Sequence, residues 1–138
     1  MEAIARRLAA HGGAALIIDY GHARSGVGDT LQAVRAHDYA DPLADPGEAD
    51  LTAHVDFEAV AKAAIAAGAQ VTEAIPQGIW LERLGIAARS EALAAAHPER
   101  ADGFAADMHR LCDPERMGAL FKVVAIHSPD WPVPAGFE

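Results

Sequence analysis

Apolar positions recur at helical spacing in several segments of the chain. In residues 55–69 they follow the i, i+3, i+4 pattern of an amphipathic helix: Phe57, Val60, Ala61, Ala64 and Ile65. Asp56 is suited to cap the first turn of this helix, and Gly68 to end it. Four other segments predict helices, the first and second of them short: residues 2–10, 77–85, 88–97 and 103–112. We expect Asp113 to begin one further short turn that closes at Gly118.

Three other segments favour strands. Residues 14–19, with the sequence AALIID, are apolar without alternation, which is typical of a strand buried on both faces of a helix-covered parallel sheet. Residues 70–75 and 120–128 are the other two strand candidates. The mixture of helices and strands predicts an α/β fold in a single domain, residues 1–138.

Residues 21–55 lack clear periodicity and are rich in turn-forming residues. They still carry Leu31, Val34, Tyr39 and Leu43, so an ordered insertion is expected, with a strand or hairpin arm in its middle. Residues 129–138 contain three prolines, and we expect an irregular tail there.

Composition excludes several classes of partner. The net charge is −9, with 20 acidic and 11 basic side chains, which argues against a nucleic-acid partner because such binding needs cations that neutralise phosphates. A single cysteine, Cys112, excludes an intramolecular disulfide and a multi-cysteine zinc site. No apolar stretch approaches the roughly 20 residues needed to span a bilayer, so no membrane partner is expected. With no signal-peptide pattern at residues 1–13, a cytoplasmic location is expected.

Candidate chemistry gathers after the first strand. In open parallel sheets, ligands bind at the carboxyl ends of strands, where Asp19, Tyr20, Gly21 and His22 lie here. Asp19 or His22 could orient a substrate or move a proton. In the structural alternative, Asp19 only caps the strand end and Gly21 only permits a turn.

Other motifs give weaker signals. The glycines of GVGDTLQ, residues 26–32, fit neither dinucleotide-binding nor P-loop spacing, so no phosphate site is predicted. His54 and Asp56, with His22, would suit a small metal hydrolase, but a metal site needs three or four converging ligands. The alternative is an Asp56 that caps a helix and a partly exposed His54, and no metal site is expected.

Four longer segments together resemble one known family: GGAALIIDYGH, GDTLQAVRAHDYADPLADPGEADLTAHVDF, PQGIWLERLGIAAR and LCDPERMGALFKVVAI. In this order they resemble the C-terminal half of the MidA-type methyltransferases, which use S-adenosylmethionine and include a mitochondrial arginine methyltransferase. The resemblance implies the class I, Rossmann-like sheet. Residues 14–19 would be its fifth strand, 70–75 its sixth and 120–126 its antiparallel last strand. The insertion and the helices of 77–110 would be additions around the substrate side.

The resemblance also implies site residues. The catalytic side chains would be Asp19, His22, His54 and Asp56. The substrate-binding residues would be Tyr20, Gly21, Gly28, Asp29, Thr30, Leu31, Phe57 and Gln77. A protein with an arginine acceptor is the implied substrate, which suits the acidic charge.

The family's cofactor motif has no counterpart in this chain, so no cofactor-binding residue is assigned. We therefore expect a truncated portion of a methyltransferase that is inactive alone and does not itself bind S-adenosylmethionine. The alternative is a non-catalytic module that works as a homodimer or beside a separate cofactor-binding chain. In either case, one edge of the strand at 14–19 is expected to be unpaired.

Overall fold

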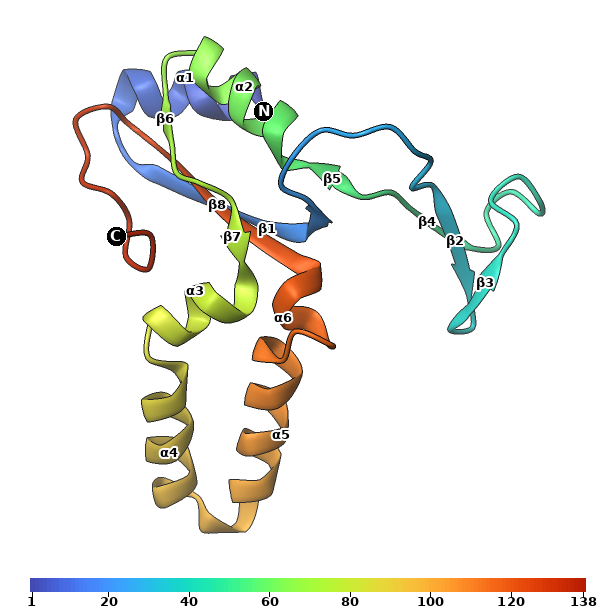
Figure 1. Ribbon diagram of the computed structural model, residues 1–138, viewed down its shortest axis with the longest axis vertical. Helices are drawn as coiled ribbons and strands as arrows, with labels where there is room; N and C mark the ends of the chain where they lie inside the picture. Colours follow the sequence, from blue (N-terminus) through green and yellow to red (C-terminus); the bar gives the residue numbers. More distant parts are fainter.

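The computed structural model describes residues 1–138 and has three parts: a sheet with two covering helices, a projecting β arm, and a helical hairpin (Figure 1). The α-helices are α1 (Glu2–His11), α2 (Phe57–Ala66), α3 (Gln77–Arg83), α4 (Ile86–Ala96), α5 (Ala101–Cys112) and α6 (Met117–Leu120). The strands are β1 (Ala14–His22), β2 (Gln32–Arg35), β3 (Asp38–Ala40), β4 (Asp50–Thr52), β5 (Val55–Asp56), β6 (Gln70–Val71), β7 (Ile75–Pro76) and β8 (Phe121–His127).

The main sheet is built on the antiparallel pair β1 and β8, which is in register from Ala14 opposite His127 to Tyr20 opposite Phe121. The strand order is β5-β1-β8-β6, with β7 also on β8. Only β5 runs parallel to β1. The α/β class is therefore confirmed, but the expected parallel sheet around residues 14–19 is largely antiparallel.

Helices α1 and α2 pack on one face of this sheet. Its core is formed by Ala5 of α1, Ala64 of α2, Ala69 and Ile126 of β8, with Ile17 of β1 against them. The small alanine side chains let the helices approach the sheet closely. Asp56 caps α2 as expected, because its carboxylate accepts a hydrogen bond from the Ala59 amide at 3.0 Å.

The expectation that β1 is buried on both faces is wrong. Leu16 and Ile18, on the face away from α1 and α2, are 46% and 44% exposed. β8 lines one edge of β1, whereas β5 pairs with the other edge only at Gly21 and His22. The rest of that edge has no partner strand, as expected.

Two other predicted elements differ in extent. The strand expected at 70–75 is split into β6 and β7, because Thr72 turns its hydroxyl to the Ala125 amide at 2.9 Å. The short turn expected to close at Gly118 is instead followed by α6, which contains Gly118.

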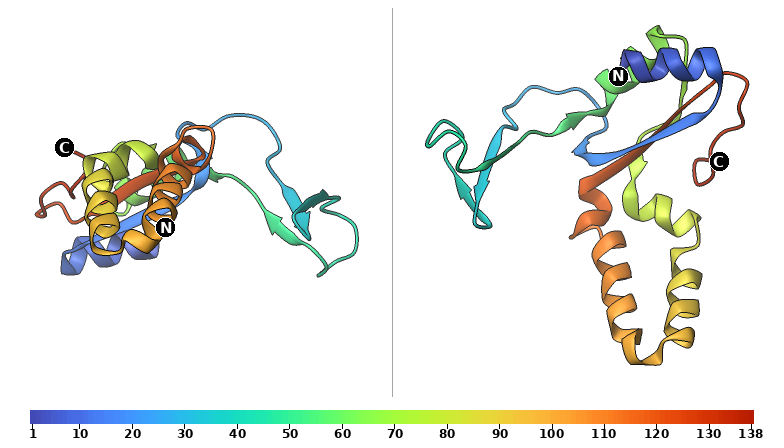
Figure 2. Two further views of the ribbon diagram at one scale, coloured as in Figure 1. Left: turned by 90° about the horizontal axis from the view of Figure 1, so that it is seen from below. Right: turned by 180° about the vertical axis from the view of Figure 1, so that it is seen from behind.

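The arm lies between β1 and β5 and carries a separate antiparallel sheet in the order β3-β2-β4. It extends away from the body in every view (Figures 1 and 2). Strands β2 and β3 form the hairpin that was one of the two possibilities for this segment. Ala36 and His37 both have positive φ, 51° and 72°, as a tight two-residue hairpin turn requires.

The helical hairpin of α4 and α5 projects from the lower end of the sheet in Figure 1. The irregular tail folds back on α3, where the Trp80 indole donates to the Ala135 carbonyl at 3.2 Å. No helix in the structure is long and apolar enough to cross a membrane.

Candidate active site at the end of strand β1

The site begins where β1 meets β5. Gly21 lies opposite Val55, and His22 lies opposite Asp56. A Cβ added to Gly21 would stand 2.1 Å from the Val55 carbonyl oxygen, closer than any real contact. Glycine is therefore required by the close approach of the two backbones, which brings the start of α2 beside the end of β1.

Four aromatic rings form a row at this point. The Tyr20 ring lies edge to face with Phe121 at 5.7 Å and with His54 at 5.8 Å, and His22 follows His54 at 6.5 Å between ring centroids. All four side chains are half-buried. Thr30 supports the row, because its hydroxyl accepts a hydrogen bond from the His54 amide at 3.2 Å. Two imidazoles and a phenol are thus held together at an accessible surface.

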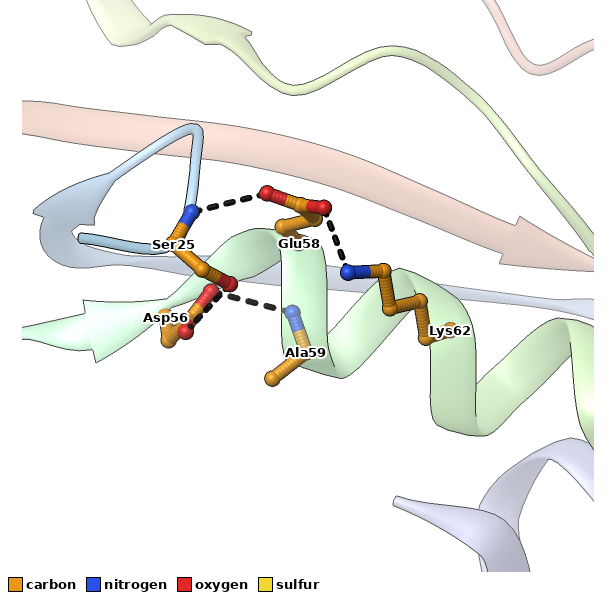
Figure 3. A network of polar contacts seen from close by, with 5 residues as sticks. All are labelled: Ser25, Asp56, Glu58, Ala59 and Lys62. Carbon is orange, nitrogen blue, oxygen red and sulfur yellow. Dashed lines mark hydrogen bonds and ion pairs between the residues drawn. The ribbon is translucent and has the colours of Figure 1, made fainter.

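Asp56 is the centre of a polar network beside this row (Figure 3). One carboxylate oxygen accepts from the Ala59 amide, and the other accepts from the Ser25 hydroxyl at 2.7 Å. These two hydrogen bonds hold the pKa of Asp56 below its ordinary value, and the bond from the Ala59 amide has the larger effect. Asp56 is therefore a carboxylate at neutral pH, with one hydrogen bond already on each oxygen.

Glu58 extends the network to the loop that leaves β1. It accepts a hydrogen bond from the Ser25 amide at 2.8 Å and forms an ion pair with Lys62. The ion pair lowers the pKa of Glu58 and raises that of Lys62. We call Ser25, Asp56, Glu58 and Lys62 the root clamp, because they join both ends of the arm to α2.

The structure brings only some of the expected residues together. Tyr20, Gly21, His22, His54 and Asp56 share one corner, and Thr30 touches it through His54. Gly28, Asp29 and Leu31 lie in the segment that leads into the arm, where Asp29 accepts from the Leu31 amide at 2.9 Å.

Three expected residues lie apart from this corner. Side chains alternate along a strand, so Asp19 faces away from Tyr20 and His22; its carboxylate accepts from the Tyr20 amide at 2.8 Å. Phe57 is 1% exposed and belongs to the core. Gln77 is 6% exposed and donates to the Leu111 carbonyl at 3.0 Å, so it joins α3 to α5.

The sequence interpretation missed the root clamp. The spacing of Glu58 and Lys62, four residues apart on a helix, was a readable signal for their ion pair. Nothing local in the sequence pairs Ser25 with Asp56, which lies 31 positions further along the chain.

The described residues contain no group of three or more histidine, cysteine or acidic side chains that could hold a metal ion. His22, His54 and Asp56 therefore do not form the ligand set that the metal hydrolase hypothesis needs. The glycine loop of residues 26–28 leads from β1 into the arm rather than into a helix N-terminus, so it lacks the strand-loop-helix geometry that holds phosphate groups.

Comparison with known proteins decides the family. The sequence model of the S-adenosyl-L-methionine-dependent methyltransferases that correspond to the MidA type matches residues 1–75. The chain belongs to this family.

Similar proteins support the same assignment. A protein arginine methyltransferase NDUFAF7 homolog from Drosophila melanogaster is 40% identical over 144 residues, which is 98% of this chain and 32% of the relative. Human protein arginine methyltransferase NDUFAF7 is 34% identical over 128 residues, 91% of this chain and 29% of the relative. The chain thus spans about a third of the length of these curated relatives.

Two crystal structures of Burkholderia thailandensis proteins have the same fold. One, of an uncharacterized protein, superposes with a TM-score of 0.78 at 29% identity, over 99% of this chain and 37% of that one. The other is bound to S-adenosyl-homocysteine and superposes with a TM-score of 0.77 at 29% identity, over 99% of this chain and 36% of that one. Both confirm that the fold is part of a Rossmann-like methyltransferase.

The expectation of a cytoplasmic location is contradicted. The Drosophila, Xenopus laevis and human relatives are all named mitochondrial proteins. Absence of a signal-peptide pattern was no guide to the compartment.

Proposed function

We propose that these 138 residues form the acceptor side, in the C-terminal portion, of an S-adenosylmethionine-dependent protein arginine methyltransferase. The family supports the reaction class, and the printed names of the relatives support an arginine acceptor in a protein substrate. The observation that carries the proposal is the row of Tyr20, His54 and His22 beside the Asp56 carboxylate at the end of β1.

The corner suits a guanidinium group. S-adenosylmethionine, when bound, supplies an electrophilic methyl group, and a guanidinium nitrogen that accepts it must release one proton. The imidazole of His22 or of His54 is the group that we assign to take up that proton. The Tyr20 ring offers a flat surface to the guanidinium plane, and the ionised Asp56 keeps a negative charge close by.

Other residues of the expected site act through these groups. Gly21 allows β5 to approach β1, and Thr30 holds the His54 backbone. Gly28, Asp29 and Leu31 shape the path into the arm. We assign Asp19, Phe57 and Gln77 to positioning, since their contacts are with the fold itself.

We further propose that the chain alone transfers no methyl groups. Two observations support this proposal: the family's cofactor motif has no counterpart among these residues, and the Drosophila relative is about three times as long. The free edge of β1, with Leu16 and Ile18 half-exposed beside it, is the surface at which a further strand of a complete methyltransferase would add to the sheet.

A chimera tests this function. The chain would replace the matching residues of the Drosophila relative, and transfer of labelled methyl groups to protein arginine would be measured. The chimera is expected to be active, and His22→Gln with His54→Gln is expected to slow transfer by about 10²–10⁴-fold, as loss of a proton acceptor does. The exposed Glu91→Gln change in α4 is the control. A folded, active chimera in which the double change has no effect would overturn the proposed roles.

The second candidate is a non-catalytic homodimer, favoured by the same free edge and by the exposed Leu16 and Ile18. Pairing of two β1 edges would cover both. Light scattering after size-exclusion chromatography distinguishes the candidates, since the module hypothesis requires a dimer that Leu16→Lys dissociates. A monomer contradicts it.

A further inference from the structure

The arm carries the most exposed large hydrophobic side chains of the molecule. The three most exposed large hydrophobic side chains are Val27, Leu43 and Tyr39, at 107%, 86% and 81%, and all three lie on it. Leu51 on β4 is a further 60% exposed. Isolated exposed hydrophobic residues are common, but a group on one projecting element is typical of an interaction surface.

These side chains do not stabilise the arm itself. Between residues 23 and 54 only Ala33 is buried, and the three strands are four, three and three residues long. A small sheet needs an apolar face packed against something to be stable on its own. The root clamp fixes where the arm leaves the body, while most side chains of the arm stay exposed or half-buried.

Charge decides which kind of partner fits the arm. Residues 24–53 carry two arginines and six carboxylates, a net charge of −4. Since the whole chain carries −9, the remaining residues carry −5. A second copy of the chain would therefore bring like charges together, whereas a cationic segment would be attracted.

A hollow on the arm has the chemistry to hold a cationic side chain. It has a volume of about 230 Å³ and is lined by Tyr39, Asp41, Asp45 and Glu48, among others. Arg35 is also one of its lining residues, and its guanidinium lies 3.4 Å from the exposed Asp45 carboxylate, so Asp41 and Glu48 are the carboxylates of the hollow without an ion pair. The same wall thus combines carboxylates with an aromatic ring, which together recognise guanidinium and ammonium groups.

We propose that the arm docks a cationic, apolar-flanked segment of the methyl-acceptor protein, outside the methyl-transfer site. An arginine or lysine side chain enters the hollow beside Asp41 and Glu48, and neighbouring apolar side chains cover Tyr39 and Leu43. Because the arm begins at the end of β1, it leaves the body beside the row of Tyr20, His54 and His22. The identity of the partner as acceptor rests on the proposed function.

Fluorescence anisotropy with the 138-residue chain tests the docking without any methyl transfer. The probe is a short labelled peptide that alternates arginine with leucine and valine, and its neutral twin carries glutamine in place of arginine. Asp41→Asn with Glu48→Gln is expected to weaken binding of the cationic peptide about 5- to 10-fold at low salt. Asparagine preserves the acceptor that Asp41 offers to the Leu43 amide.

A charge-matched control separates docking from general attraction. Glu91→Gln with Asp102→Asn removes two exposed carboxylates from the helical hairpin and is expected to change affinity less than about twofold. Tyr39→Ser with Leu43→Ser is expected to weaken binding at both low and high salt, because it removes apolar contact. Circular dichroism confirms that each variant is folded.

Each outcome decides the matter. Equal losses in the arm and hairpin variants, or equal binding of the cationic and neutral peptides, would overturn the docking proposal. A loss of peptide affinity in the arm variants alone supports it, even if the chimera proves inactive. The docking proposal and the proposed catalytic roles are therefore tested independently.

Discussion

The sheet body and the arm differ in what holds them in place. In the body, β8 is buried from Val123 to His127 and packs against helices α1 and α2. In the arm, Ala33 is the sole buried residue, and the contacts that fix it lie at its root, where Ser25 bonds to Asp56 and Glu58. Packing therefore fixes the body, and a few polar contacts fix the direction of the arm.

This difference indicates that stability and recognition depend on different parts of the molecule. Side chains of the body govern the free energy of unfolding, whereas arm side chains face solvent and are free to serve recognition. The candidate active site lies at the junction of the two, so the root clamp holds the start of the arm beside the row of Tyr20, His54 and His22. Four changes test this difference between the sheet body and the arm, and they are given in order of decreasing expected effect.

Ile126→Ala removes a fully buried side chain between α1, α2 and the sheet. The resulting cavity is expected to lower the free energy of unfolding by about 2–5 kcal/mol, measured by urea denaturation. Leu43→Ala on the arm is the matched change and is expected to cost less than about 0.5 kcal/mol. Similar costs for the two variants would remove the distinction between body and arm.

Gly21→Ala tests the junction. The added methyl group overlaps the Val55 carbonyl, which must move away, and we expect a loss of about 1–3 kcal/mol in the free energy of unfolding. Gly103→Ala in α5, where a Cβ meets nothing within 4 Å, is expected instead to stabilise by about 0.5–1 kcal/mol. If alanine changes the free energy of unfolding equally at both positions, the close approach of β5 to β1 does not explain why residue 21 is glycine.

Ser25→Ala breaks the hydroxyl contact of the root clamp with Asp56. Global stability is expected to change little, while trypsin cleavage after Arg35 accelerates severalfold relative to cleavage after Arg89, because the arm samples more open positions. Ser90→Ala in α4 serves as the control. An unchanged cleavage ratio would show that the clamp does not restrain the arm.

Acid should release the clamp in a defined pH range. The folded pKa values of Asp56 and Glu58 lie below their ordinary values of 3.8 and 4.5, so the clamp is intact above those values and is lost as pH falls through the lower folded values. An NMR titration of the Ser25 amide, which donates to Glu58, is expected to show a midpoint below 4.5. Lys62→Met should raise that midpoint, since the ion pair is the main cause of the shift. A wild-type midpoint at or above 4.5 contradicts the assignment.

Local signals in the sequence predicted the helices well. The apolar spacing of residues 55–69 and the cap at Asp56 located α2, and the helices predicted at 88–97 and 103–112 correspond to α4 and α5. These elements depend on contacts within a few residues, which periodicity and capping rules describe directly.

Features that depend on distant partners could not be predicted in the same way. The apolar sequence of β1 is compatible with a strand covered on one face or on both faces. The exposure of Leu16 and Ile18 was therefore not predicted. Thr72 splits a predicted strand by bonding to Ala125, and Gln77 bonds to Leu111 across 34 positions. The family resemblance named residues that the structure brings together at the end of β1, but it also named Asp19, Phe57 and Gln77, which lie apart, and it did not indicate the root clamp.

The most direct test of the central claim is a calorimetric titration of S-adenosylmethionine into the 138-residue chain. The Burkholderia protein whose structure contains S-adenosyl-homocysteine serves as the positive control. An acceptor side without a donor cradle predicts no saturable heat from this chain under conditions in which the control binds. Stoichiometric, saturable binding by the chain alone would contradict the claim, since its residues would then build the donor site themselves.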